Sequence, residues 1–435
     1  MKTIACHTLG CRVNQYDTQA MLELFLADGY IEVPFTDNAD VYLINTCTVT
    51  GTGDKKSLQL ARHIRRIHPE SALILCGCLA QKRGEALLKD TGASLIIGTT
   101  KRADVVRLLE QYKRSGEPFS AVEPLTEKMK YESLHISSQS DHTRADLKIQ
   151  EGCNNRCTYC TIPSVRGPIR SRPADDIIQE ASRLAHNGFR ELVLTGIHLS
   201  SYGKDLNPQI SLLDILQRLQ TVEGVERIRL GSLEPTIATY DFAKGISVLP
   251  KVCPQFHLAL QSGSDTVLSR MARRYNTSMY LKAVCNLRSF FPDAAITSDI
   301  LTGFPGETED EFQQTVDFIR KIGFARIHVF PYSPRTGTVA ASMPGQLSSA
   351  VKEERARKLI SVGAGTSFSY MRSLIGHTTS VLLEENTDGN LWSGYTPEYI
   401  RVSICNAPSL YQGKKITVKL VSVGKDGMKG EMINE

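Results

Sequence analysis

Short apolar runs alternate with segments of helical periodicity along the first 115 residues. The runs that predict strands are residues 3–8, 40–45, 72–76 and 94–97. Short apolar strands that are separated by helices are typical of a parallel sheet with crossover helices. The pattern therefore predicts an N-terminal parallel α/β domain over residues 1–115.

A second series of strand and helix patterns follows a polar segment. Residues 116–145 hold little periodic pattern and predict a linker. Beyond it, strands are predicted at residues 146–150, 191–195, 227–230, 255–260, 295–301 and 326–330. Repeated β/α units of this number curl into a barrel or partial barrel, whose active site lies at the C-terminal ends of the strands. We assign residues 146–370 to this second domain.

From residue 371 the pattern changes to short strands separated by Gly, Asn and Asp turns. The predicted strands are residues 379–384, 391–395, 400–404, 415–423 and 429–433. Such a run favours a small closed all-β barrel of the kind that binds oligonucleotides, over residues 371–435. Acidic and basic residues balance in this segment, so a structural cap is the alternative. Any RNA contact there depends on patterned groups such as Lys414, Lys415 and Tyr411. The whole chain is thus predicted to be an α/β multidomain protein with an all-β C-terminus.

The composition is that of an ordinary globular protein, with 41% hydrophobic and 22% charged residues. The sequence shows neither an apolar leader nor a stretch of about 18 apolar residues, so we expect a cytoplasmic protein without a membrane segment. The net charge of +5 permits an RNA partner without demanding one. Eleven cysteines, an odd number, favour metal ligation over disulfides in a reducing compartment.

Cys153, Cys157 and Cys160, here called the core triad, follow the first strand of the second domain with the spacing C-x3-C-x2-C. Three thiolates this close can hold three irons of a [4Fe–4S] cluster and leave the fourth iron open for a ligand. A structural zinc site would need a fourth Cys or His at short range, and no such cysteine follows. Incidental core cysteines are the other alternative. The triad therefore predicts a reactive iron–sulfur cluster.

A second set of cysteines, here called the N-terminal triad, consists of Cys11, Cys47 and Cys78. Each lies just beyond a predicted strand, and ligands of parallel sheets gather outside the carboxyl ends of the strands. Taken singly, each could be a small buried hydrophobe, but three at equivalent positions predict a second cluster site. The remaining cysteines are expected to be structural: Cys6, Cys76, Cys253, Cys285 and Cys405.

These motifs resemble those of a known family. The core triad, with Tyr159 before its last cysteine, is similar to the cluster motif of the radical S-adenosylmethionine (SAM) enzymes. The order of the domains, with a C-terminal barrel resembling the TRAM domain, is that of the methylthiotransferases within that group. The motifs that carry this resemblance are residues 8–11, 45–47, 77–81 and 166–172. It implies two [4Fe–4S] clusters and two SAM molecules per turnover, one as radical source and one as methyl donor, which convert a C–H bond into C–S–CH3.

The resemblance also implies contacts to SAM. Tyr159 is expected near the adenine, although it could be a plain core tyrosine. Gly196 ends the second strand of the barrel, where a backbone without a Cβ can approach the methionyl group. Gln261 and Ser262 suit hydrogen bonds to the ribose, and the turn that begins at Asp299 could bracket the adenine. These last two segments could equally be strand-to-helix loops.

Two basic groups are candidates for RNA phosphate contacts at the mouth of the barrel. They are Arg166, Arg170 and Arg172, and Arg270, Arg273 and Arg274. Solvated surface positions are the alternative. A third basic group, on the second N-terminal helix, is more simply a solvated face: Lys55, Lys56, Arg62, Arg65 and Arg66.

The residues after the first triad cysteine, Cys11-Arg-Val-Asn14, resemble the branch that acts on N6-threonylcarbamoyladenosine at position 37 of tRNA. The implied partners are the anticodon stem-loop of tRNA and an electron donor such as flavodoxin or ferredoxin, with the sulfur source open. The alternatives are methylthiolation of N6-isopentenyladenosine in tRNA or of a ribosomal-protein aspartate. An iron–sulfur electron-transfer or RNA-binding protein is the non-enzyme alternative. It does not explain why each set has three cysteines, since electron carriers usually close all four corners.

Overall fold

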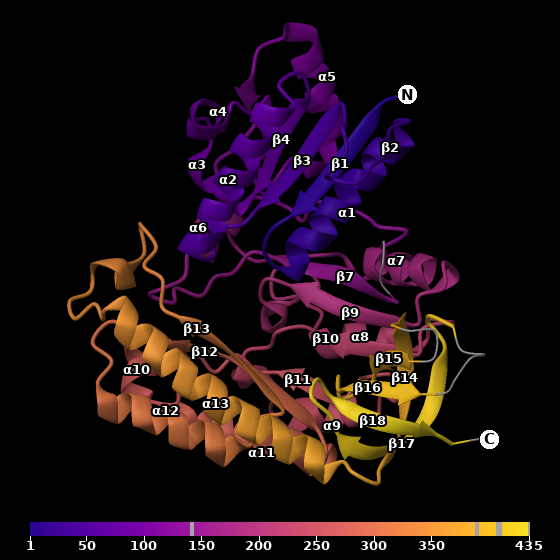
Figure 1. The fold of residues 1–435 in the computed structure, drawn as a ribbon, viewed down its shortest axis with the longest axis vertical. Helices are drawn as coiled ribbons and strands as arrows, with labels where there is room; N and C mark the ends of the chain where they lie inside the picture. Colours follow the sequence, from indigo (N-terminus) through magenta and orange to yellow (C-terminus); the bar gives the residue numbers. More distant parts are fainter. Residues whose placement is uncertain (140–142, 388–390, 406–410, 434–435) are drawn as a thin grey trace.

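The computed structural model describes residues 1–139, 143–387, 391–405 and 411–433. Figure 1 shows three parts, with the N-terminal domain in indigo and violet above the central domain and the C-terminal barrel in yellow beside the central domain. This is the α/β multidomain architecture that the sequence predicts. Of the helices described, none has the length and apolar character to cross a bilayer.

The N-terminal domain is a six-stranded parallel sheet in the order β2-β1-β3-β4-β5-β6. Its strands are β1 (Thr3–Thr8), β2 (Ile31–Glu32), β3 (Val41–Thr46), β4 (Ala72–Gly77), β5 (Leu95–Ile96) and β6 (Phe119–Ser120). Its helices are α1 (Arg12–Ala27), α2 (Gly51–Ile67), α3 (Cys78–Arg83), α4 (Ala86–Thr91) and α5 (Val105–Ser115), with the 3-10 turn η1 (Arg102–Asp104). Every residue of β3 and β4 is buried because separate apolar clusters cover both faces of the sheet. The sequence missed β2 and β6, which have two residues each.

The segment predicted as a linker packs against the central domain instead of standing free. Leu134 and Ile136 are buried in its core, and the Tyr131 hydroxyl donates to the Lys148 carbonyl at 3.0 Å. Residues 140–142 of this predicted segment lie outside the described residues. The buried apolar residues of this segment do not follow the period of a helix or a strand. The sequence therefore showed no pattern there.

The central domain contains all six predicted barrel strands and one short antiparallel strand. They are β7 (Arg144–Glu151), β8 (Arg170–Ser171), β9 (Glu191–Gly196), β10 (Arg227–Leu230), β11 (Gln255–His257), β12 (Ala295–Thr302) and β13 (Arg326–Pro331). The order is β8-β7-β9-β10 and β11-β12-β13, and a parallel bridge between Leu233 and Leu258 joins the two sheets. The result is a partial (β/α) barrel with β8 and β13 at its edges.

Helices cover the outer face of this curved sheet, except the first, which packs against α3 of the N-terminal domain. They are α6 (Ile162–Arg166), α7 (Ala174–His186), α8 (Leu212–Gln220), α9 (Tyr240–Ser247), α10 (Asp265–Arg270), α11 (Thr277–Phe290), α12 (Glu309–Ile322) and α13 (Ser349–Ser373). The 3-10 turns are η2 (Leu199–Ser201), η3 (Pro235–Ile237) and η4 (Val339–Ser342). Capping boxes at Ser211 and Thr308 fix the starts of α8 and α12, because each hydroxyl accepts from the backbone of the third helical residue.

The C-terminal part is a closed five-stranded barrel, as the sequence predicts, in the order β14-β15-β16-β18-β17. Its strands are β14 (Thr378–Asn386), β15 (Leu391–Tyr395), β16 (Arg401–Cys405), β17 (Lys415–Val423) and β18 (Met428–Met432). Val381, Trp392, Val402 and Val418 meet in its core. This closed barrel is consistent with the TRAM-like domain that the sequence predicts.

Arginines at the beginnings of the central strands hold the C-terminal barrel in place. Arg229 Nη1 donates to the Pro397 carbonyl at 2.7 Å, and its guanidinium lies 4.7 Å from the centre of the Tyr399 ring. Arg227 Nη2 donates to the Ser380 carbonyl at 2.8 Å. Glu191, fully buried, accepts from Arg229 Nε at 2.7 Å. The C-terminal barrel therefore docks at the opposite end of the strands from their carboxyl ends.

Candidate active site

The core triad occupies the loop between β7 and α6, at the carboxyl ends of the central strands. All three cysteines line one cavity of about 140 Å³, together with side chains from the loops after β9, β10 and β11. Gly152 starts this loop at φ +73°, and a Cβ there would lie 1.8 Å from the Pro168 carbonyl oxygen. Only glycine permits this close return of the chain, which folds the cysteines back over the strand ends.

Each thiol of the core triad accepts a hydrogen bond. The backbone nitrogens of Asn155 and Ile162 lie 3.4 Å from Cys153 Sγ and Cys160 Sγ, respectively. Arg273 Nη1 donates to Cys157 Sγ at 3.2 Å. Burial raises the pKa of Cys160 to about 12, an effect that the donors and the Arg273 charge oppose. These hydrogen bonds favour the thiolate form, which is the form that binds a metal.

The N-terminal triad forms at the carboxyl edge of the parallel sheet. Cys11 is the N-cap of α1, Cys47 follows β3 and Cys78 opens α3. A Cβ on Gly10 would lie 2.9 Å from the Cβ of Cys47, so the Cys11 and Cys47 loops are in contact. Burial raises the pKa of Cys78 to about 11, and the Cys11 and Cys47 thiols also raise it. The three thiols therefore lie close enough together for their charges to interact.

Each triad offers three thiol sulfurs, the ligand set of a [4Fe–4S] cluster with one open iron. Among the residues that the structure describes, no three Cys, His, Asp or Glu side chains converge where one ion could sit. A cubane gives each thiolate its own iron, so its ligands stand farther apart than those of one tetrahedral zinc. The donors to sulfur in both sites fit a cluster as well. The assignment of the six cysteines as ligands stays a prediction.

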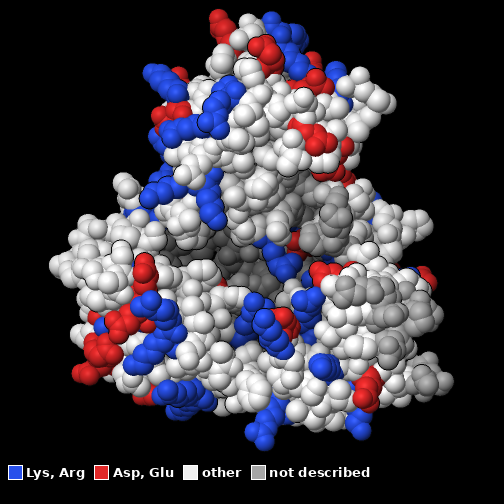
Figure 2. All heavy atoms as spheres, viewed as in Figure 1, with Lys and Arg blue, Asp and Glu red and all other residues white. Residues whose placement is uncertain are grey.

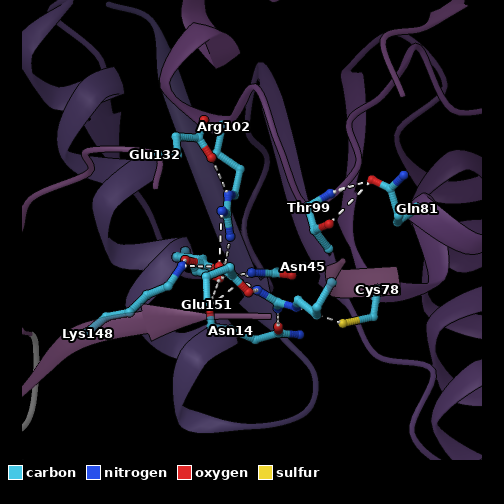
Figure 3. Close-up of polar contacts among 12 residues, drawn as sticks. Asn14, Asn45, Cys78, Gln81, Thr99, Arg102, Glu132, Lys148 and Glu151 are labelled. Carbon is cyan, nitrogen blue, oxygen red and sulfur yellow. Dashed lines mark hydrogen bonds and ion pairs between the residues drawn. The ribbon is translucent and has the colours of Figure 1, made fainter. Parts of the chain in front are cut away.

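A fully buried group of charged side chains, here called the buried charge cluster, lies beside Cys78 of the N-terminal triad (Figure 3) and includes the last residue of β7, just before the core triad. Its members are Asp17, Arg102, Lys148, Glu151 and Arg166. Lys148 Nζ lies 2.6 Å from Asp17 and 2.5 Å from Glu151. In Figure 3 Lys148 and Arg102 converge on Glu151, with Asn14 and Cys78 beside them. Since Asp17 and Arg102 belong to the N-terminal domain, the cluster joins that domain to the central one.

Of the residues predicted to contact SAM, one lines the cavity of the core triad and four do not. Tyr159 lines the cavity of the core triad, whereas Gly196, Gln261, Ser262 and Asp299 lie outside its lining. Ser262 is fully buried, and its hydroxyl bonds to Thr315 Oγ1 at 3.2 Å and accepts from the Ser264 backbone.

The other three lie at strand ends. Gly196 packs against Gln150, where a Cβ would lie 3.0 Å from the Cβ of Gln150. Gln261 has φ +70° and bonds through its backbone nitrogen to the Asp299 carbonyl, while the Asp299 carboxylate faces His257 Nε2 at 3.4 Å. A ribose contact thus does not fit Ser262, whose hydroxyl serves the scaffold, and the other contacts stay predictions.

Two cavity residues were missed from the sequence, His198 and Glu234. His198 Nε2 and Glu234 Oε2 are 3.0 Å apart, and the Gln150 side chain accepts from the His198 backbone nitrogen at 2.6 Å. Burial raises the pKa of Glu234, but the hydrogen bond and charge of His198 outweigh it and hold that pKa below its usual range. An anionic carboxylate therefore faces the cavity. The available signal was their position just past the predicted strands 191–195 and 227–230.

The predicted phosphate-binding arginines divide into two kinds. Arg166 and Arg172 are fully buried and Arg170 nearly so, which corrects the expectation that they meet RNA. Arg172 pairs with Glu180 at 2.5 Å, and both side chains are fully buried. Each charge therefore compensates the desolvation of the other. Arg273 is committed to Cys157 and to the Tyr275 hydroxyl. Arg274 is exposed and remains a candidate.

Other basic side chains lie at the surface. In Figure 2 lysines and arginines border the hollow between the N-terminal domain and the lower half of the molecule. Lys414 and Lys415 line a groove with Tyr411, and the Lys414 ammonium lies 5.5 Å from the Tyr411 ring centre. On α2, Arg62 and Arg65 donate to the Asp90 and Gly92 carbonyls. These bonds tie α2 to the end of α4 and the turn after it.

Comparison with known proteins agrees with this arrangement. Residues 3–98 match the uncharacterized protein family UPF0004, and residues 147–319 match the radical SAM superfamily. The chain is 39% identical over 438 residues to the threonylcarbamoyladenosine tRNA methylthiotransferase MtaB of Bacillus subtilis, covering 100% of this chain and 97% of the relative. It is 36% identical to the MtaB of Thermotoga maritima, covering 92% and 91% of the two chains.

The chain also resembles a relative with a different name and a solved structure of similar fold. A tRNA-2-methylthio-N(6)-dimethylallyladenosine synthase of Moorella thermoacetica is 34% identical over 445 residues, with 100% and 99% coverage. Among solved structures, the radical SAM methyltransferase TsrM of Kitasatospora setae, with cobalamin and a [4Fe–4S] cluster bound, has a TM-score of 0.56 at 12% identity. It covers 82% of this chain and 85% of that chain, and shows the fold alone. On its full-length relatives and its two family matches, the chain belongs to the radical SAM methylthiotransferase family.

Proposed function

We propose that this protein converts N6-threonylcarbamoyladenosine at position 37 of tRNA into its 2-methylthio derivative. The observation that carries the proposal is the 39% identity over the whole chain to the Bacillus subtilis enzyme named for threonylcarbamoyladenosine. Relatives from Thermotoga maritima and Aquifex aeolicus carry the same name at 36% and 38% identity. The residues Cys11-Arg-Val-Asn14 point to the same branch.

The geometry supports a division of labour between the triads. The core triad would hold the cluster that, with SAM, supplies a 5′-deoxyadenosyl radical, while the N-terminal triad would hold the cluster that delivers sulfur. The chain's own part in the first site is to bind and orient SAM. Tyr159 offers an aromatic face in the cavity, and the Glu234 carboxylate, held by His198, would offer a negative charge to the SAM amino group.

The tRNA partner fits the surface of the C-terminal barrel. Lys414, Lys415 and Tyr411 combine charge with an aromatic ring, the pairing that suits phosphates and unstacked bases. Arg274, which follows Arg273 in the sequence, adds an exposed cation. Reduction of the core cluster requires an electron donor, for which flavodoxin or ferredoxin is the proposed class.

The runner-up substrate is N6-isopentenyladenosine, also called N6-dimethylallyladenosine. The Moorella thermoacetica relative named for it matches the full length of this chain at 34% identity. Both substrates share the adenine and its C2–H bond and differ in the group on N6, so the triads serve either reaction. The lower identity ranks this substrate second.

The test is incubation of the reconstituted protein with SAM, a reductant and sulfide, using tRNA that carries one or the other modified adenosine. Mass spectrometry of the nucleosides should detect 2-methylthio product from the threonylcarbamoyl tRNA and little from the isopentenyl tRNA. A variant in which the N-terminal triad is changed to Ala is the matched control. The reverse preference would establish the runner-up, and absence of product from both tRNAs in an active SAM-cleaving preparation would reject a tRNA substrate.

A further inference from the structure

Arg166 connects the two triads through its guanidinium group. Its Nε donates to Cys78 Sγ at 3.2 Å, and its Nη1 lies 2.7 Å from Glu151 Oε1 and 3.1 Å from Asp17 Oδ2. Its Nη2 donates to Asn14 Oδ1. The side chain is fully buried, so water does not compete for these bonds.

The chain positions of these partners tie Arg166 to both triads. Arg166 itself ends α6, the short helix that follows the core triad, and Glu151 ends β7 just before Cys153. Asn14 lies in the first turn of α1, which Cys11 caps. One side chain thus contacts a thiol of the N-terminal triad and two side chains, Asn14 and Glu151, from the segments that carry Cys11 and Cys153.

The buried charge cluster places a cation directly at Cys78. Arg102, Lys148 and Arg166 share two fully buried carboxylates, Asp17 and Glu151. Glu132 is 19% exposed and pairs with Arg102, at the far side from Cys78. Arg166 is therefore the cation of this cluster that contacts the sulfur of Cys78.

We propose that Arg166 is a positioning residue that fixes Cys78 as a thiolate ligand and raises the reduction potential of the N-terminal cluster. A hydrogen bond and a positive charge at a ligand sulfur both favour the cluster state with one more electron. Their effect is strong because the site is buried and the local dielectric constant is low.

A raised potential serves the proposed function, on which this consequence rests. In the proposed reaction the C2–H bond would break by transfer of the hydrogen atom to the adenosyl radical, and a C–S bond to a methylsulfide anion would form. One electron would then have to leave the product. A cluster held by the N-terminal triad would supply the acceptor for that electron, and the Arg166 donor at Cys78 would make it a better acceptor.

The test is a redox titration followed by EPR, on the full chain with the core triad changed to Ala so that only the N-terminal cluster assembles. Arg166→Gln removes both the charge and the sulfur donor, and Arg166→Lys keeps the charge. Arg102→Gln is the matched control, since it removes an equally buried guanidinium that contacts Asp17 and Glu151 but not Cys78. Pulsed EPR on ¹⁵N-arginine-labelled protein reports directly on a nitrogen beside the cluster.

We expect Arg166→Gln to shift the midpoint to more negative potential than Arg102→Gln does, with Arg166→Lys in between. The arginine nitrogen coupling should persist in Arg102→Gln and vanish in Arg166→Gln. A midpoint in Arg166→Gln equal to that of its parent or of Arg102→Gln overturns the proposal. If Arg166→Gln takes up no iron, Arg166→Lys decides, and an unchanged midpoint there overturns it. Because neither SAM nor tRNA is present, these outcomes are independent of the substrate assignment.

Discussion

Asp17 holds the N-terminal domain to the central domain, and its replacement by Asn isolates the contribution of one charge. Its carboxylate, 1% exposed on α1, pairs with Lys148 at 2.6 Å and Arg166 at 3.1 Å, and also with Arg102. Burial raises the pKa of Asp17, but these three cations outweigh burial and lower it. Asp17→Asn keeps the shape and leaves three buried cations against Glu151.

The expected cost follows from the burial of the whole group. Removing one partner of a buried ion pair costs about 3–5 kcal/mol because the remaining charges stay desolvated. At about 1.4 kcal/mol per factor of ten, the population with the domain contact open rises by roughly 10² to 10³·⁵. A multidomain chain does not unfold in one step, so native-state hydrogen exchange at the amides of α1 and β7 is the proper assay.

Two comparison variants make the result decisive. Glu110→Gln removes a carboxylate from an exposed pair with Lys113 at 3.2 Å, which should cost less than about 1 kcal/mol. Asp17→Asn combined with Lys148→Met removes one charge of each sign and should recover much of the lost protection. Exchange in Asp17→Asn no faster than in Glu110→Gln, or no recovery in the double variant, would refute the reasoning.

Two other predictions concern the triads and the response to acid. Changing the N-terminal triad to Ala should remove about half of the iron, which is roughly eight atoms for two clusters. The same variant should lose methylthiolation while SAM cleavage to 5′-deoxyadenosine continues, and chromatography measures both products. Methylthio product from this variant would mean that these cysteines are structural. The paired guanidinium of Arg270 lowers the pKa of Glu311 to about 2. Glu311 therefore stabilises the fold fully above its unfolded pKa of about 4.3 and loses this contribution as pH falls toward 2. The difference in hydrogen-exchange protection of the α12 amides between wild type and Glu311→Gln, compared at the same pH, should narrow over that range. A difference independent of pH would contradict the ion pair.

The hydrophobic pattern was sufficient for the long strands and insufficient for most of the short ones. β3, β4 and β9 are almost wholly buried apolar runs, so period and composition reveal them. β2, β6 and β8 have two residues each, too few for any period. β5 is equally short, but it was found because it lies in the apolar run Leu95-Ile96-Ile97. The linker segment was misjudged because Leu134 and Ile136 are isolated apolar residues whose burial depends on the domain they cover.

The cysteines of the candidate site stood out in the sequence, whereas the charged residues around them did not. Arg166 and Arg172 were assigned to RNA because a cluster of arginines ordinarily lies in water or on phosphate. Their carboxylate partners Asp17 and Glu180 are distant in sequence, so nothing local announced a buried ion pair. Glu234 and His198 were missed for the same reason, since they meet only when β9 and β10 lie side by side.

The docking of the C-terminal barrel has a consequence for which nucleotide is modified. The barrel is fastened at the beginnings of β7 and β10, and the core triad stands beyond the end of β7. In the proposed function, the central sheet would fix the distance between a tRNA-binding C-terminal barrel and the core triad. Moving the modification to another nucleotide would then require a new docking angle of the barrel at Arg227 and Arg229 rather than a new cavity.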